Sequence, residues 1–156
     1  MKVDKQKPDT YILTNLKNLD PVTVYVTNYE TGKGKIVIEC FGSAWAFSWG
    51  GMGERSLQEF FISCNNDYIL NKLLKTTTQT DFDAINDAAK KKGFDICVTS
   101  DVEVAMQYDQ MTDCFGTDWF MDLPTCSTHE YKYLDGIVNA VKEAFKHECE
   151  VVASTN

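Results

Sequence analysis

The sequence predicts an α+β fold, in which a small antiparallel sheet of three or four strands packs against several helices. Three observations favour this class. Segments rich in β-branched and aromatic residues alternate between residues 20 and 50, apolar residues recur at helical spacing from residue 56 onward, and a long amphipathic helix is expected at the C-terminus. Strands that precede helices in this way are typical of α+β domains.

The length of 156 residues suits one globular domain, and a hydrophobic content of 44% is enough to build its core. We expect residues 1–19 to form a partly ordered N-terminal extension, residues 20–150 a single domain and residues 151–156 a flexible tail. The chain has no apolar run of about 18 residues, and its charged N-terminus lacks the apolar segment of a secretory signal. These features predict a cytoplasmic protein that does not enter a membrane.

The sheet is expected to begin with a hairpin. Asp20-Pro21 interrupts any regular structure before it, and residues 22–27, which are rich in β-branched residues, are expected to form a strand. The glycines of Gly32-Lys33-Gly34 turn the chain into a second strand over residues 35–40. Gly42 then bends the chain into a third strand.

The third strand has two different faces. Its alternation places aromatic side chains on one face and small side chains on the other; the aromatic residues are Trp45, Phe47 and Trp49, and the small residues are Ala44, Ala46 and Ser48. Small side chains permit close packing, so we expect a helix to lie across their face. The aromatic face then belongs either to the core or to an exposed platform.

Capping motifs predict where several helices begin. Ser56-Leu57-Gln58-Glu59 has the form of a capping box, which indicates a helix that starts there. Asn65-Asn66-Asp67 either interrupts this helix or starts another. A further helix is expected to begin at residue 80 or 81 and to end at Gly93, after three lysines.

The segment before the C-terminal helix is expected to contain a strand, a helix and a loop. Residues 94–99 alternate as a short strand, and a helix capped at residue 100 or 101 follows, with Val102, Ala105 and Met106 on its buried stripe. Residues 114–127 are expected to form a loop held by aromatic side chains. Residues 127–130 repeat the capping-box form and start the C-terminal helix.

Charge is distributed unevenly along the chain. Residues 1–92 contain 12 Lys and Arg against 11 Asp and Glu, whereas residues 93–156 contain 3 against 12. From Gly93 to Tyr131 there are eight acidic residues and no basic residue, which disfavours contact with nucleic-acid phosphates. Such a segment is either a solvated face that aids solubility or an acidic surface for a basic partner.

Aromatic residues within this acidic segment make it the expected partner-binding site. Aromatic anchors surrounded by charge are typical of recognition surfaces. The candidate contact residues are Asp109, Asp113, Asp118, Trp119, Phe120 and Asp122.

Two alternatives compete with protein binding. A single-stranded nucleic-acid binder would stack bases on the aromatic strand among cations, and its site residues would be Lys33, Lys35, Trp45, Phe47, Trp49 and Arg55. A small enzyme or zinc protein would instead use Cys114, Cys126 and His129, which offer Cys-x-x-His spacing and a thiol just before a helix. No motif indicates a cofactor, and we expect a protein that is not an enzyme.

One pattern in the chain resembles a known family. Gly42-x-Ala44-Trp45-x-x-x-Trp49-Gly50-x-Met52-Gly53 is followed by Phe60-Phe61-x-x-Cys64-x-x-Asp67-Tyr68 and by Lys72-Leu73. Over about residues 20–75 the chain is similar to accessory proteins of enterobacterial phages and prophages. The resemblance implies a protein that binds and disables a host factor in the bacterial cytoplasm, such as a nucleic-acid-handling defence complex. An acidic segment is compatible with that role, because basic nucleic-acid grooves attract acidic surfaces.

Overall fold

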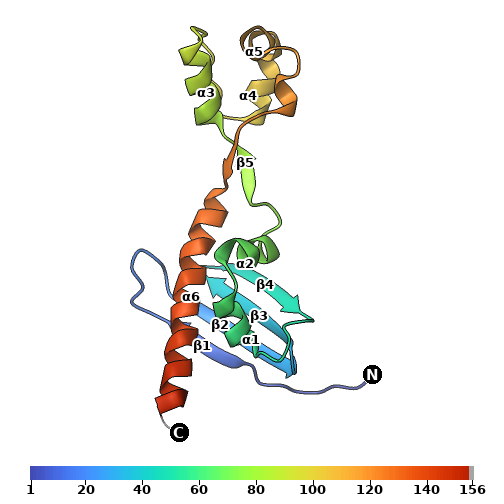
Figure 1. The fold of residues 1–156 in the computed structure, drawn as a ribbon, viewed down its shortest axis with the longest axis vertical. Helices are drawn as coiled ribbons and strands as arrows, with labels where there is room; N and C mark the ends of the chain where they lie inside the picture. The colour runs from blue at the N-terminus through green and yellow to red at the C-terminus, as the bar shows by residue number, and fades with distance from the viewer. Residues whose placement is uncertain (155–156) are drawn as a thin grey trace. The chain divides into compact units, whose positions relative to one another are not determined.

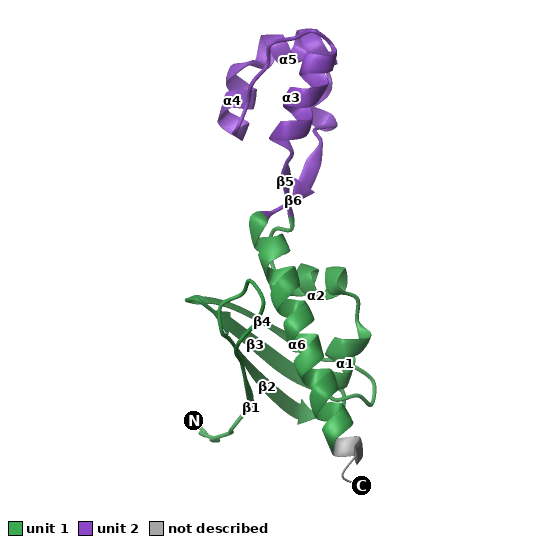
Figure 2. Ribbon diagram, turned by 90° about the vertical axis from the view of Figure 1, so that its left-hand side faces the viewer, with its two compact units in different colours: residues 1–77, 129–156 green, residues 78–128 purple. Residues whose placement is uncertain are grey.

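The computed structural model describes residues 1–154, with side chains described through residue 151. The chain forms two compact units (Figure 2): unit 1 comprises residues 1–77 and 129–156, and unit 2 comprises residues 78–128. Each unit has its own cluster of buried apolar side chains. The span of residues 20–150, expected to form a single domain, thus contains two separately packed cores, because residues 78–128 bury apolar side chains of their own.

Unit 1 is built on a four-stranded antiparallel sheet with the order β1-β2-β3-β4 (Figure 1). Its strands are β1 (Asp9–Leu13), β2 (Val22–Glu30), β3 (Lys33–Cys40) and β4 (Ser43–Trp49). The predicted hairpin and third strand are present, and the α+β class is confirmed. The first strand lies within the expected N-terminal extension and pairs with β2 from Asp9 opposite Val26 to Leu13 opposite Val22.

Three helices cover one face of this sheet in both ribbon views: α1 (Leu57–Ser63), α2 (Asn66–Leu73) and α6 (His129–Ser154). The covered face carries the aromatic side chains of β4, and Trp45 and Trp49 are each only 6% exposed. The small residues of β4 are exposed instead. The expectation of a helix across the small-residue face is therefore wrong, because burying large aromatic side chains stabilises the fold far more than burying alanine and serine.

Local hydrogen bonds place the first two helices. The Ser56 hydroxyl accepts from the Glu59 amide at 3.3 Å, and the Glu59 carboxylate accepts from the Ser56 amide at 2.8 Å, so the predicted capping box is formed. The amide of Ser56 is also the main reason why the pKa of Glu59 is lowered. Asn65 caps α2 by accepting from the Tyr68 amide at 2.7 Å.

A polar cluster joins the start of α2 to α6. The Lys142 ammonium group donates to the Cys64 carbonyl at 2.6 Å and to the Asn66 side-chain oxygen at 2.7 Å, and burial lowers its pKa. The Asn66 amide nitrogen donates to Asp135 at 2.6 Å and to Asn139 at 2.9 Å. The cluster fixes the register of the long helix against the two short ones.

The long helix begins later than its capping motif suggests. Ser127 is paired in a strand of unit 2, and α6 starts at His129. The Glu130 carboxylate accepts from the Trp45 indole N–H at 2.8 Å. The helix continues through residues 151–154 of the expected tail, and residues 155–156 lie outside the described residues. Within the described part of the chain, none of the helices combines the length and apolar character that a bilayer crossing needs.

Unit 2 combines a short β-ladder with helices. β5 (Thr78–Thr80) pairs with β6 (Thr125–Ser127), and between them lie α3 (Phe82–Lys91), α4 (Asp101–Met106), α5 (Tyr108–Phe115) and the 3-10 helix η1 (Trp119–Met121). The helix predicted from residue 80 or 81 is confirmed, with Asp81 as its cap. The loop expected over residues 114–127 contains the end of α5, η1 and β6. The core of the unit consists of Ile85, Ala89, Ile96, Val98, Val104, Met111, Cys114 and Trp119.

The strand expected over residues 94–99 does not form. The side chain of Asn86 on α3 forms hydrogen bonds with both backbone polar groups of Val98. Its oxygen accepts from the Val98 amide and its nitrogen donates to the Val98 carbonyl, each at 2.9 Å. A side-chain amide thus supplies the hydrogen bonds that a neighbouring strand would supply. The backbone hydrogen-bonding groups of Val98 therefore have partners although no β-ladder forms.

Replacing Asn86 with alanine is expected to destabilise unit 2 by about 1–3 kcal/mol, because the backbone amide and carbonyl of the fully buried Val98 lose their hydrogen-bond partner. Urea unfolding and amide hydrogen exchange at Val98 measure the effect. Gln110→Ala, an exposed substitution in the same unit, serves as the control and is expected to cost less than about 0.5 kcal/mol. Unchanged exchange at Val98 in the Asn86 variant would contradict this role of the side chain.

Candidate functional site

Unit 2 holds most of the net charge of the protein. Its 51 residues contain ten acidic and three basic side chains, a net charge of −7, whereas the rest of the chain has thirteen acidic and twelve basic residues, a net charge of −1. The four candidate aspartates of the sequence site are all exposed. Asp109 and Asp113 lie four residues apart on α5, so they share one helix face. Asp118 and Asp122 flank η1 on either side.

The two aromatic candidates have different environments. Trp119 is 9% exposed and belongs to the core of unit 2, where its indole N–H donates to the Thr112 hydroxyl at 3.2 Å. Its ring lies 5.6 Å from that of Tyr108 and 6.0 Å from that of Phe120. Tyr108 and Phe120 are each at least half exposed. Trp119 is therefore the buried support of an aromatic cluster, whose surface consists of Tyr108 and Phe120.

Several exposed apolar residues of unit 2 were not among the candidates. Val102 and Met106 were expected in the core, but Val104 is the buried residue of α4, while Met106 is 81% exposed. A six-residue helix buries little more than one side chain, and Val102 and Met106 share its outer face at i,i+4 spacing. With Phe94, Tyr108, Phe120 and Met121 they form what we call the exposed apolar set of unit 2.

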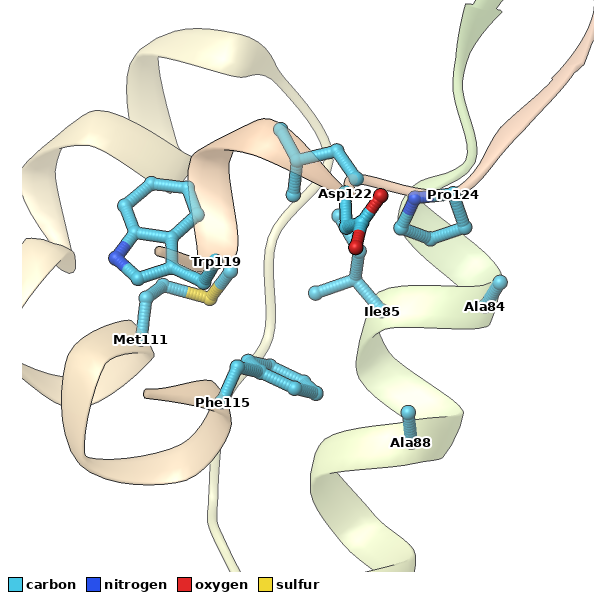
Figure 3. Close-up of a pocket in the computed structure, with 9 residues that line it drawn as sticks. Ala84, Ile85, Ala88, Met111, Phe115, Trp119, Asp122 and Pro124 are labelled. Carbon is cyan, nitrogen blue, oxygen red and sulfur yellow. The ribbon is translucent and has the colours of Figure 1, made fainter. Parts of the chain in front are cut away.

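A cavity of about 230 Å³ lies in unit 2 beside the aromatic cluster (Figure 3). It is bounded on one side by α3 and on the other by α5, η1 and the segment that follows. Nearly all of the wall is apolar, and Asp122 is its one charged residue. The wall consists of Ala84, Ile85, Ala88, Met111, Phe115, Trp119, Asp122, Leu123 and Pro124. The pattern of the sequence contains no signal for this cavity, because its wall comes from segments about thirty residues apart.

Contacts at both ends of α3 hold this helix in place. At its start, the Asp81 amide donates to the Pro124 carbonyl at 2.8 Å, and the Asp81 carboxylate accepts from the Ala84 amide at 2.9 Å. At its end, the Lys92 ammonium group donates to the Cys114 carbonyl at 2.9 Å and lies 4.8 Å from the centre of the Phe115 ring. The cavity thus lies between segments that are connected at two points.

The residues of the nucleic-acid alternative do not form a stacking platform. Trp45 and Trp49 are buried and Phe47 is half-buried under the helices of unit 1. Lys35 pairs with Ser48 in the sheet register and so lies on the opposite face from these rings. Lys33 forms an ion pair with Glu30, and Arg55 donates to Met52 and Ser63. Rings and cations are therefore not presented on one open surface.

The residues of the zinc or thiol alternative lie in different environments. Cys114 is buried in the core of unit 2, Cys126 is half-buried in β6, and His129 is exposed at the start of α6. Among the residues that the structure describes, no three His, Cys, Asp or Glu side chains lie close enough together to hold a metal ion. The structure therefore gives no support to a ligand set of Cys114, Cys126 and His129.

Most of the chain matches a known protein family. The family model Phage_phiTE_072, described as a phage family, matches residues 1–147. No curated protein and no solved structure matches the chain. The family match includes both units and most of α6, well beyond the segment of residues 20–75 that carried the resemblance in the sequence. The chain belongs to a phage protein family.

Proposed function

We propose that this phage protein is an accessory factor that binds and inhibits a host protein through unit 2, and that it acts by binding and not by catalysis. One observation carries the proposal: a unit of 51 residues with a net charge of −7 also exposes six large apolar side chains. Charge alone would serve solubility, but exposed apolar side chains oppose it. Their combination is typical of a binding surface with apolar anchors and a charged rim.

The charge of unit 2 indicates the chemistry of the partner. An acidic surface accelerates association with a basic one and repels nucleic acid. A basic groove that handles nucleic acid, as in a defence complex of the host cytoplasm, is the kind of surface that this unit complements. Competition with nucleic acid for such a groove would be the mode of inhibition.

The proposal is tested by capture of host proteins from a bacterial lysate on the immobilised phage protein, followed by binding and activity measurements with the purified partner. We expect the association rate constant to fall as the salt concentration rises from about 0.05 to 0.5 M, since screening weakens steering between charged surfaces. We also expect the nucleic-acid-dependent activity of the partner to decline as the phage protein is added.

A pair of matched variants locates the binding surface. The double substitution Val102→Ser and Met106→Ser removes two exposed apolar residues of unit 2 and is expected to weaken binding by about tenfold or more. Ile12→Ser removes an equally exposed apolar residue of unit 1 and is expected to leave binding unchanged. Equal loss in both variants, or recovery of no partner, would reject the proposal.

A further inference from the structure

The cavity of unit 2 is too small for most cofactors. Its volume of about 230 Å³ lies below the roughly 300–1,000 Å³ of pockets that enclose small-molecule ligands. A nucleotide would not be enclosed by it. One aromatic or long aliphatic side chain is an object of suitable size, and such a side chain is what a protein partner offers to a pocket at the centre of an interface.

The wall of the cavity indicates the chemistry of its occupant. Ala84 and Ala88 lie four residues apart on α3, and their small side chains leave the space open on that side (Figure 3). Opposite them are larger apolar groups, including Phe115 and Met111. Aromatic rings and a thioether favour an apolar occupant, and an aromatic ring in particular.

The single charged group of the wall adds a second requirement. The Asp122 carboxylate lies beside Pro124 at one end of the lining (Figure 3). Asp122 is exposed, and none of the ion pairs between described residues includes it. A cation held next to the apolar occupant would pair with this carboxylate. The net charge of −7 on the unit also favours a positively charged ligand.

We infer that the cavity binds one apolar side chain, preferably aromatic, from a basic segment of the partner, and that Asp122 pairs with a Lys or Arg beside it. The inference rests on the proposed function and names the anchor of that binding surface. It gives the buried Trp119 a role, since its indole ring forms part of the cavity wall. Tyr108 and Phe120, whose rings contact that of Trp119, then offer additional contact area next to the anchor.

Three small probes of similar shape test the inference directly: 2-phenylethylamine, 2-phenylethanol and 3-phenylpropionate, which carry a cation, no charge and an anion. Binding is followed by the NMR signal of the Trp119 indole N–H, assigned with Trp119→Phe. We expect saturable shifts with dissociation constants on the order of millimolar for the amine, weaker binding of the alcohol and weakest binding of the carboxylate. Equal affinity for all three probes, or no saturable shift, would overturn the inference.

Two substitutions separate the apolar and the charged parts of the site. Ala88→Phe fills the cavity and is expected to abolish binding of every probe, whereas Ala105→Phe, the same change at an exposed position of α4, retains it. Asp122→Asn keeps the shape and is expected to remove the advantage of the amine over the alcohol, a loss of about two- to fivefold. Binding that survives Ala88→Phe would contradict the assigned site.

The same variants distinguish this inference from the proposed function. Full capture of the host partner by the Ala88→Phe variant would overturn the cavity as the anchor and leave protein binding by unit 2 in place. Ordered probe binding together with a tenfold weaker partner complex in that variant would support both. Because Asp122→Asn preserves volume at an exposed position, its probe selectivity decides the matter even if Ala88→Phe fails to fold.

Discussion

Replacing Phe145 with alanine is expected to lower the free energy of unfolding of unit 1 by about 3–5 kcal/mol. Phe145 is fully buried on α6, and its ring centre lies 5.1 Å from that of Tyr11 and 5.7 Å from that of Phe61. One side chain thus joins β1, α1 and α6. Alanine would leave a cavity between three elements that cannot all move inward, so both burial and packing would be lost.

Urea unfolding monitored by circular dichroism and by tryptophan fluorescence measures this loss. The matched control is Phe41→Ala in the same unit, because Phe41 is 86% exposed at the turn between β3 and β4. We expect the control to change the free energy of unfolding by less than about 0.5 kcal/mol. Similar losses in the two variants would show that Phe145 does not hold the three elements together.

Replacing Gly32 with alanine is expected to be the most damaging change at any turn of the sheet. Gly32 has a φ of 73°, and a Cβ atom there would lie 2.1 Å from the carbonyl oxygen of Gly53. The amide of Met52 also donates to the Gly32 carbonyl at 2.8 Å, so the two backbone segments are tied together. The Cβ atom is fixed to the backbone of residue 32 and the oxygen belongs to the backbone of Gly53, so the backbone itself would have to shift to relieve the clash.

Gly42→Ala provides the comparison that isolates this clash. Gly42 has a similar φ of 80°, but nothing lies within 4 Å of the position of its Cβ atom. Alanine at Gly42 therefore pays only for the left-handed backbone, about 1–2 kcal/mol, whereas alanine at Gly32 is expected to cost about 1–3 kcal/mol more. Measured midpoints of urea unfolding give the difference, and equal midpoints would rule out the close approach of the two loops.

The features that the sequence predicted correctly depend on near neighbours along the chain. The capping box of Ser56 and Glu59 and the cap at Asp81 need only residues three positions away. The hairpin needs a turn and two alternating strands, and those signals also lie within about twenty residues. Such features can be recognised without knowledge of what packs against them.

The errors have a common physical origin in contacts between distant segments. The alternation of residues 94–99 suggested a strand, but the hydrogen bonds of Val98 go to the side chain of Asn86. The small residues of β4 suggested a packed face, but the choice between the faces of a strand depends on which one the helices cover. In α4, apolar residues at helical spacing suggested a core stripe that the structure exposes.

The candidate site shows the same division. Exposure of Asp109, Asp113, Asp118 and Asp122 follows from their charge, since isolated carboxylates are costly to bury. The burial of Trp119 does not follow from its neighbours in the sequence, because it depends on a cluster of apolar side chains that α3, α5 and the segment between them contribute. The cavity depends on the same arrangement and has no counterpart in any sequence pattern.

The sequence by itself determined the α+β class, the capped helices, the acidic character of residues 93–131 and the resemblance to a phage family. Only the tertiary structure decided that residues 78–128 pack as a separate unit, that the aromatic face of β4 is core, and that Trp119 forms part of a cavity wall beside Asp122. The reason is that composition, caps and periodicity are local properties, whereas burial and cavities arise from which distant side chains meet.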